Sequence, residues 1–412
     1  MKPPGGEALC SSTKDEDLSL GLLDPYQASL HEELDGIRRL QHKRAVDGTA
    51  VWDLSMVNPD LPPPRMVLDR LLESVTKTAN HRYAVSRGVR RLREAFSQKY
   101  ETRFGQQLDP ETQVCVCLGS KDATFHALRV LVQRGDAVVI PTPSYPAHPS
   151  AVALAGGRSI AWQASSAPTE AAEELSRLLV SSRAKVLLLN FPSNPAGAVV
   201  SREWWYEVGK VCARHSVTIV NDFVYGEMCF SGEAAESALW ATHTGAHCVE
   251  VYSLSKAYNV PGWRVGALVG AKDVVTAVAR LKSQADYGLF LPLQYAASQA
   301  LTASENLVAP TVHAYQRRLK VLSVGLHELG WSVTQPRAGA CLWVQYPEQL
   351  GAIGGESRFR SVNVARHLLV EAGVVASPGA GFGEACDTRL RFAAVLNEER
   401  LRDVVNALRG VR

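Results

Sequence analysis

The stretch SLSKAYNVPGWRVG, residues 253–266, follows directly on the short apolar run Cys248–Tyr252. We expect this run to be a buried strand, which places Lys256 at the carboxyl end of the strand. Hydroxyl groups flank the lysine, and Arg264 follows it eight residues later. This arrangement suits a lysine amine that binds an aldehyde beside a phosphate. A lone lysine at such a place is more often a surface residue with a buried stem, so the surrounding fourteen residues carry the interpretation.

Short apolar runs alternate with amphipathic stretches from about Val114 onward. This alternation is typical of βαβ units around a mostly parallel sheet. The expected strands are Val114–Leu118, Ala137–Ile140, Lys185–Asn190, Val217–Val220, Cys248–Tyr252 and Val265–Val269, with a helix at Asp122–Gln133. Polar clusters follow the carboxyl ends of these strands, where ligands bind in open α/β sheets.

The pattern changes after about Pro292, where we expect a long helical stretch through Leu329. An α+β segment follows, with strands at Ala340–Gln345 and Arg389–Ala393 and helices at Val362–Ala372 and Glu398–Leu408. The sequence therefore predicts an α/β fold, with a large domain built on a mostly parallel sheet and a smaller α+β domain.

We predict four segments along the chain. Residues 1–24 are a disordered tail, and residues 25–55 form an N-terminal arm and part of the small domain. Residues 56–291 form the large, cofactor-binding domain, and residues 292–412 form an interdomain helix and the small C-terminal domain.

Composition excludes several classes of protein. The chain has 412 residues, of which 46% are hydrophobic and 21% are charged, and its net charge of +3 is spread without a basic block. We therefore expect no nucleic-acid or membrane partner, and the lack of a long apolar segment predicts a cytoplasmic protein. The eight cysteines are scattered without a C-x-x-C pair, so we expect reduced thiols and no metal site.

Several motifs occur in a familiar order between Pro25 and Val411. They are the lysine segment, His81-Arg82-Tyr83 with Ser86-Arg87-Gly88, Phe191-Pro192-Ser193-Asn194-Pro195, and Asp286-Tyr287-Gly288. With these motifs the chain resembles the fold-type I pyridoxal-phosphate enzymes of the aspartate aminotransferase superfamily, the class I/II aminotransferases. Within that superfamily it is most similar to the branch of alanine and LL-diaminopimelate aminotransferases.

The resemblance implies catalytic roles for Lys256, Asp222 and Tyr225, and cofactor contacts for two further residues. Lys256 would form the Schiff base with pyridoxal 5'-phosphate and act as the base at the substrate Cα. Asp222 would keep the pyridine nitrogen protonated, because an opposite charge stabilises the protonated ring. Tyr225 and Asn194 would hydrogen-bond the phenolic oxygen of the cofactor, and Tyr145 would stack on its ring.

The resemblance also assigns the phosphate and substrate contacts. Gly119-Ser120-Lys121 lies between a strand and a helix start, where backbone N–H groups favour an anion. The phosphate contacts implied are Ser120, Lys121, Ser253, Ser255, Arg264 and, from a neighbouring subunit, Tyr83. A homodimer with shared active sites follows from the role of Tyr83. Arg391 would hold the substrate α-carboxylate, with Asn194 and Val57 as further substrate contacts, and Arg389 would face the opposite side of the strand.

Val57 is a departure from the family pattern. The segment Leu54–Asp60 resembles the N-terminal loop of the active site, which usually carries glycine where this chain has Val57. A β-branched side chain could reshape the pocket near the substrate carboxylate, or a small backbone shift could accommodate it.

Three functions remain open from the sequence. The first is an aminotransferase that converts an amino acid to a keto acid. The second is a non-transaminating enzyme on the same cofactor, which carries out elimination, replacement, cyclisation or carbon–carbon bond formation in natural-product biosynthesis. The third, a non-catalytic regulator that senses the cofactor, would need a fused DNA-binding domain, for which 24 residues before Pro25 are too few. The sequence favours the first.

Overall fold

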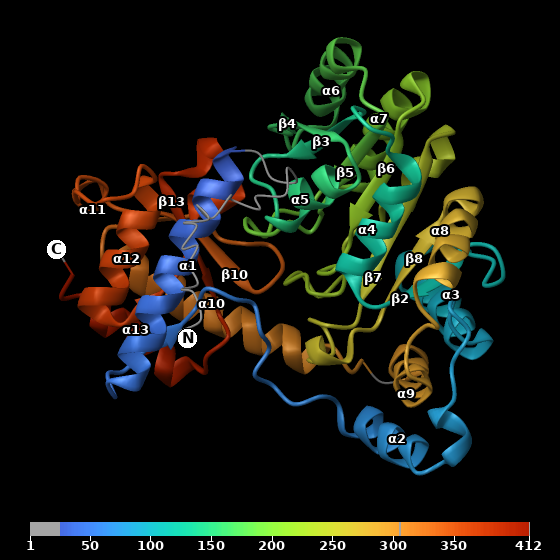
Figure 1. Ribbon diagram of the computed structural model, residues 1–412, viewed down its shortest axis with the longest axis horizontal. Coiled ribbons are helices and arrows are strands. Elements are labelled where there is room, and N and C mark those ends of the chain that lie inside the picture. Colours follow the sequence, from blue (N-terminus) through green and yellow to red (C-terminus); the bar gives the residue numbers. More distant parts are fainter. Residues whose placement is uncertain (1–24, 305, 412) are drawn as a thin grey trace, which may run out of the picture.

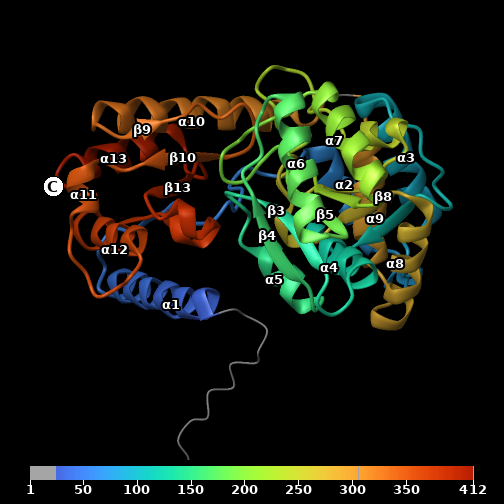
Figure 2. The ribbon, with the colours of Figure 1, turned by 90° about the horizontal axis from the view of Figure 1, so that it is seen from above.

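The computed structural model describes residues 25–304 and 306–411, which form two lobes (Figures 1 and 2). One lobe contains a seven-stranded sheet with helices on both faces. The other contains the C-terminal elements and the first helix, α1 (Pro25–Val46). The predicted disordered tail, residues 1–24, lies outside the described residues. In the described ranges, no helix has the length and apolar character needed to cross a membrane.

The seven-stranded sheet has the strand order β2-β8-β7-β6-β5-β3-β4. Its strands are β2 (Val114–Cys117), β3 (Ala137–Pro141), β4 (Arg158–Trp162), β5 (Val186–Leu189), β6 (Thr218–Asp222), β7 (His247–Ser253) and β8 (Gly266–Gly270). Only β8 runs antiparallel to its neighbours, whereas the pairs from β7 to β4 are parallel. The six predicted strands are confirmed to within one or two residues, and β4 is additional.

Side chains alternate between two apolar cores, one on each face of this sheet. Along β2, Val114 and Val116 belong to one core, and Cys115 and Cys117 belong to the other. The second core is closed by helices α4 (Ser120–Leu131), α5 (Ala147–Leu154) and α8 (Lys272–Ala285). The first core is covered by α2 (Arg65–Val75), α3 (Arg90–Phe104), α6 (Pro168–Ser182), α7 (Arg202–His215), α9 (Leu291–Thr302) and the 3₁₀ helix η2 (Ala238–Thr244). Burial on both faces explains why these strands are continuous apolar runs.

The other lobe is built on an antiparallel sheet with the order β12-β13-β10-β9. Its strands are β9 (Ser332–Val333), β10 (Cys341–Gln345), β12 (Ser377–Pro378) and β13 (Arg389–Ala393). The helices around it are α10 (Ala309–Glu328), α11 (Glu348–Gly351), α12 (Arg360–Ala372), α13 (Glu398–Leu408) and the short 3₁₀ turns η4 (Gly379–Phe382) and η5 (Glu384–Cys386). Early residues join this lobe, because α1 packs against α12 and β1 (Trp52–Asp53) pairs in parallel with β11 (Val374–Val375).

The helical stretch predicted from about Pro292 through Leu329 is interrupted and is not one continuous helix. The chain instead forms α9 and α10, separated by residues 303–308, with Pro310 in the first turn of α10. Proline has no backbone N–H to donate to a preceding helical turn, so it favours the start of a new helix at this position. Since α9 packs on α2 and α3, it lies with the first core. The division of the chain at residue 292 stays a prediction.

Candidate active site

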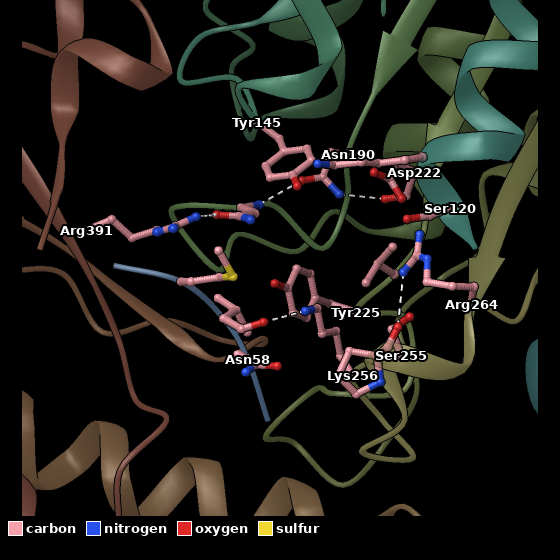
Figure 3. A pocket seen from close by; sticks show the side chains of 16 residues that line it. Asn58, Ser120, Tyr145, Asn190, Asp222, Tyr225, Ser255, Lys256, Arg264 and Arg391 are labelled. Atoms are coloured by element: carbon pink, nitrogen blue, oxygen red, sulfur yellow. Dashed lines mark hydrogen bonds between the residues drawn. The ribbon is translucent and has the colours of Figure 1, made fainter. Parts of the chain in front are cut away.

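A cavity of about 340 Å³ lies at the carboxyl ends of the central strands, between the two lobes (Figure 3). Of the thirteen residues predicted for the site, eleven line it: Val57, Ser120, Lys121, Tyr145, Asn194, Asp222, Tyr225, Ser255, Lys256, Arg264 and Arg391. Most come from loops and strand ends that the order of the central sheet brings together, whereas Val57 and Arg391 come from the other lobe. The structure thus places most of the predicted side chains around one space.

Lys256 follows β7 and extends into this cavity. Its amine donates a hydrogen bond to the backbone carbonyl of Val57, in the loop after β1. The pKa of Lys256 is lowered to about 8, mainly by burial, with smaller contributions from the cations Arg391 and Arg264 and an opposing effect of Cys341. A neutral amine is therefore accessible near neutral pH, as a nucleophilic or basic lysine requires.

Asp222 ends β6, and its buried carboxylate has one occupied and one free oxygen. Oδ2 lies 3.2 Å from Nε2 of His148, a buried histidine in α5. Among the described residues, Oδ1 has no hydrogen-bond partner. A buried, unpaired carboxylate oxygen is costly unless a ligand donor satisfies it. A protonated pyridine nitrogen is such a donor, so this carboxylate fits the ring of pyridoxal phosphate.

The loop after β5 connects the backbone of Asp222 to Arg391. The Asn190 side-chain amide donates to the backbone carbonyl of Asp222 at 2.6 Å, and its oxygen accepts from the Asn194 backbone N–H at 2.8 Å. Arg391, on β13, donates from Nη1 to the Asn194 Oδ1 at 3.0 Å. The sheet of one lobe thereby meets a loop of the other at the cavity (Figure 3).

Arg391 is held in place by further contacts. It donates from Nη2 to Ser377 Oγ at 3.0 Å and to the backbone carbonyl of Ser55. Its guanidinium carbon lies 4.9 Å from the centre of the Phe382 ring. Arg391 is buried and lines the cavity, while Arg389, two residues earlier on the strand, does not. A planar cation fixed in this way suits a substrate carboxylate.

The opposite end of the cavity has the features of an anion site. Ser120 is the first residue of α4, so the amino end of that helix faces the cavity. Gly119 has a φ of +84°, and a Cβ there would lie 2.4 Å from Nη2 of Arg264. Glycine thus lets the guanidinium approach the helix start. Ser255 completes this group, which could hold the phosphate of the cofactor.

Two predicted residues do not line the cavity. Ser253 is buried behind it and donates from Oγ to Ser255 Oγ at 2.9 Å. Tyr83 is 82% exposed, and its ring centre lies 4.4 Å from that of Tyr287. A single chain therefore does not use Tyr83 in this site.

Sequence reasoning missed His148, Asn190, Met56 and Asn58. The last two line the cavity next to Val57. Asn190 stands at the end of a predicted strand, which is a position that favours ligand contacts and could have singled it out. His148 follows Tyr145 by three residues, one helical turn, but its contact with Asp222 spans 74 residues and left no local signal.

Comparison with known proteins agrees with this geometry. A family model described as aminotransferase class I and II matches residues 49–408. The glutamate-pyruvate aminotransferase AlaC of Escherichia coli K12 is 37% identical over 396 residues, which cover 95% of this chain and 91% of that protein. An LL-diaminopimelate aminotransferase of Moorella thermoacetica is 32% identical over 366 residues, covering 88% of this chain and 91% of that protein.

A solved structure is similar throughout the fold. Substrate-bound BacF from Bacillus subtilis superposes with a TM-score of 0.81 at 26% identity, covering 92% of this chain and 94% of the BacF chain.

Proposed function

Since this chain belongs to the class I and II aminotransferases, which use pyridoxal 5'-phosphate, we propose that it moves the amino group of an α-amino acid to a 2-keto acid in the cavity around Lys256. One observation carries the proposal: a single cavity contains the lysine amine, the free oxygen of Asp222 and the guanidinium of Arg391. These are the groups that must act on one amino-acid substrate.

The bound cofactor supplies an electron sink for the carbanion at the substrate Cα. Lys256 would hold the cofactor through its aldehyde, and its neutral amine would serve as the base that moves the proton of the substrate Cα. With the cofactor bound, Oδ1 of Asp222 would accept a hydrogen bond from the ring nitrogen and so keep that nitrogen protonated. His148 contacts the other oxygen of that carboxylate, and Asn190 donates a hydrogen bond to the backbone carbonyl of Asp222.

Arg391 and the helix start at Ser120 fix the two ends of the reacting complex. Arg391 binds the α-carboxylate, which orients the Cα–H bond toward Lys256. Ser120, Ser255, Arg264 and Lys121, which line one end of the cavity, would bind the phosphate, and Tyr145 would stack on the ring. Burial raises the pKa of Tyr225, so this phenol stays protonated and would donate a hydrogen bond to the phenolic oxygen of the cofactor.

The donor and acceptor are proposed from relatives. Because AlaC is named for glutamate and pyruvate, we propose a small or acidic donor such as alanine or glutamate, with LL-diaminopimelate as the second choice. The purified enzyme with bound cofactor is incubated with these amino acids in the absence of an acceptor. Formation of the pyridoxamine form and the matching keto acid supports the proposal. Ammonia release or a cyclised product, with no keto acid, contradicts it and supports the non-transaminating alternative.

Arg391 and Arg389 provide a matched pair of variants for the same assay. Arg391→Gln removes the carboxylate contact and should raise the KM for the donor, whereas Arg389→Gln should leave it unchanged. Equal effects of the two substitutions on the KM would contradict the assignment of Arg391 to the substrate carboxylate.

A homodimer in the cytoplasm is the last part of the proposal. Two observations support the dimer: Tyr83 is 82% exposed, and Tyr287, which it contacts, is 65% exposed. Large aromatic side chains in contact on a surface are typical of interfaces between subunits. In the dimer we expect Tyr83 to reach the phosphate in the partner's cavity.

A further inference from the structure

A fully buried lysine outside the cavity connects the proposed phosphate site to the surface that carries Tyr83. Lys282 lies in α8 with no exposed side-chain area. Its amine lies 3.1 Å from Asp122 Oδ2 and 2.7 Å from Asp286 Oδ2. A buried ammonium between two carboxylates is costly to leave unpaired, so these three residues are strongly held together.

Asp122 links Lys282 to the loop before α4. The same Oδ2 accepts the backbone N–H of Leu118 at 2.8 Å, and Oδ1 lies 3.1 Å from Nε2 of His126. On the other side of the chain, the carbonyl of Leu118 accepts a hydrogen bond from Arg264 Nη2 at 3.2 Å. Asp122 and Arg264 therefore hold this peptide segment from both directions, immediately before Gly119 and Ser120.

Asp286 links Lys282 to the loop after α8. Its Oδ1 accepts the backbone N–H of Gly288 at 2.6 Å. Gly288 has a φ of +80°, and a Cβ there would lie 2.6 Å from the carbonyl oxygen of Val85. The Asp286–Gly288 loop thus packs closely on the segment that carries Tyr83. Within this loop, the ring of Tyr287 contacts the ring of Tyr83.

We propose that Lys282 is a positioning residue that fixes the phosphate loop, residues 118–121, relative to the Tyr83–Tyr287 pair. Lys282 touches neither cofactor nor substrate. It acts through Asp122 on the backbone N–H groups that face the phosphate, and through Asp286 on the loop that supports Tyr83. The inference rests on the proposed phosphate site at Ser120, Ser255 and Arg264.

The test compares two ligands that differ only in the phosphate. Apoprotein is titrated with pyridoxal 5'-phosphate and with pyridoxal. The dissociation constant for pyridoxal divided by that for pyridoxal 5'-phosphate measures how much the phosphate contributes to binding. Lys282→Met should weaken binding of pyridoxal 5'-phosphate by about 10-fold or more, the scale of a lost charge-assisted hydrogen bond, and leave pyridoxal within about twofold. The exposed Lys272→Met, in the same helix, is the matched control and should change neither constant.

A second variant keeps the test decisive if Lys282→Met does not fold. Asp286→Asn retains the contact of Lys282 with Asp122 and lies outside the cavity lining. It should also lower the preference for the phosphorylated ligand, by several-fold. A general loss of stability would weaken the binding of both ligands to the same extent and leave the ratio unchanged. An unchanged ratio in Lys282→Met, or in Asp286→Asn where that is the variant that folds, overturns the proposal.

Ser255→Ala and Arg264→Gln distinguish this result from a failure of the proposed function. Both should lower the ratio if the phosphate binds where we propose. If they lower it and the Lys282 and Asp286 variants do not, only the positioning role is wrong. If they leave it unchanged, the phosphate site itself is wrong.

Discussion

The amine of Lys256 donates a hydrogen bond to the backbone carbonyl of Val57, a residue 199 positions earlier in the chain. The loop after β1 therefore lines the cavity with its backbone, and Val57 as a whole is only 6% exposed. A substitution at this position changes both the packing of the loop and the placement of the carbonyl that faces the lysine. The predictions below start from this lysine and move outward.

Lys256 should be the single covalent attachment site of the cofactor. Borohydride reduction of the loaded enzyme, followed by peptide mapping, should find the pyridoxyl group on Lys256. Lys256→Ala should fold, lack the absorbance of the lysine-bound cofactor and turn over negligibly, because one amine serves as both anchor and base. A pyridoxyl group on another lysine contradicts the assignment.

Cofactor attachment should depend on pH through the pKa of Lys256, about 8. Below this value most of the amine is protonated and cannot attack an aldehyde. The attachment rate to apoprotein, followed by stopped-flow absorbance, should therefore rise about tenfold per pH unit below pH 8 and level off above it. A rate that keeps rising to pH 10 would indicate an unperturbed lysine.

The same lowered pKa predicts how stability changes with pH. The folded protein releases the Lys256 proton at about pH 8 and the unfolded chain at about 10.5, so unfolding takes up a proton between these values. The free energy of unfolding of apoprotein should therefore rise with pH in this window, by on the order of 2 to 3 kcal/mol. Lys256→Met should lack this rise. Denaturant unfolding of both proteins at pH 7 and pH 10 measures the difference, and parallel pH profiles would contradict it.

Asp222 and His148 should differ in the size of their effects. Asp222→Ala removes the partner of the ring nitrogen and should reduce kcat by about 100-fold or more, with little change in folding. His148→Ala removes one hydrogen bond to that carboxylate and should cost about 10-fold, because Asn190 still holds the backbone of Asp222. Near-normal turnover of Asp222→Ala would contradict the catalytic role of Asp222.

Subunits with complementary defects should restore activity in a shared-site dimer. Lys256→Ala and Tyr83→Phe subunits are each impaired, and a mixed dimer contains one site with both residues intact. Mixing after dissociation should recover some activity, up to a quarter of that of the parent if association is random. Verified heterodimers without any recovery would show that Tyr83 does not serve the partner's site.

Val57→Gly tests whether valine restricts the substrate. If the β-branched residue holds the loop away from common donors, glycine should improve use of alanine, aspartate or glutamate by roughly 10- to 200-fold in kcat/KM. Thermal stability is measured alongside, since loss of folding cannot produce a gain of activity. An unchanged donor preference would mean that the loop accommodates valine by a backbone shift.

The sequence by itself determined six of the seven strands of the central sheet and most of the candidate site residues near them. A run such as Ala137–Ile140 is apolar throughout because both faces of its strand are buried, and neighbouring residues carry that information. Lys256 and Asn194 could be named because each follows such a run within a recognisable motif, and Asp222 because it follows the run Val217–Val220 at the position that the family resemblance implies.

Only the tertiary structure decided which of these groups meet and what holds them. The order β8-β7-β6-β5 brings Lys256, Asp222 and Asn190 to one edge, and no local pattern specifies that order. The pairing of Lys282 with Asp122 spans 160 residues, and that of Lys256 with the Val57 carbonyl spans 199. Such contacts depend on packing between distant elements, whereas periodicity and turn chemistry report only on residues a few positions apart.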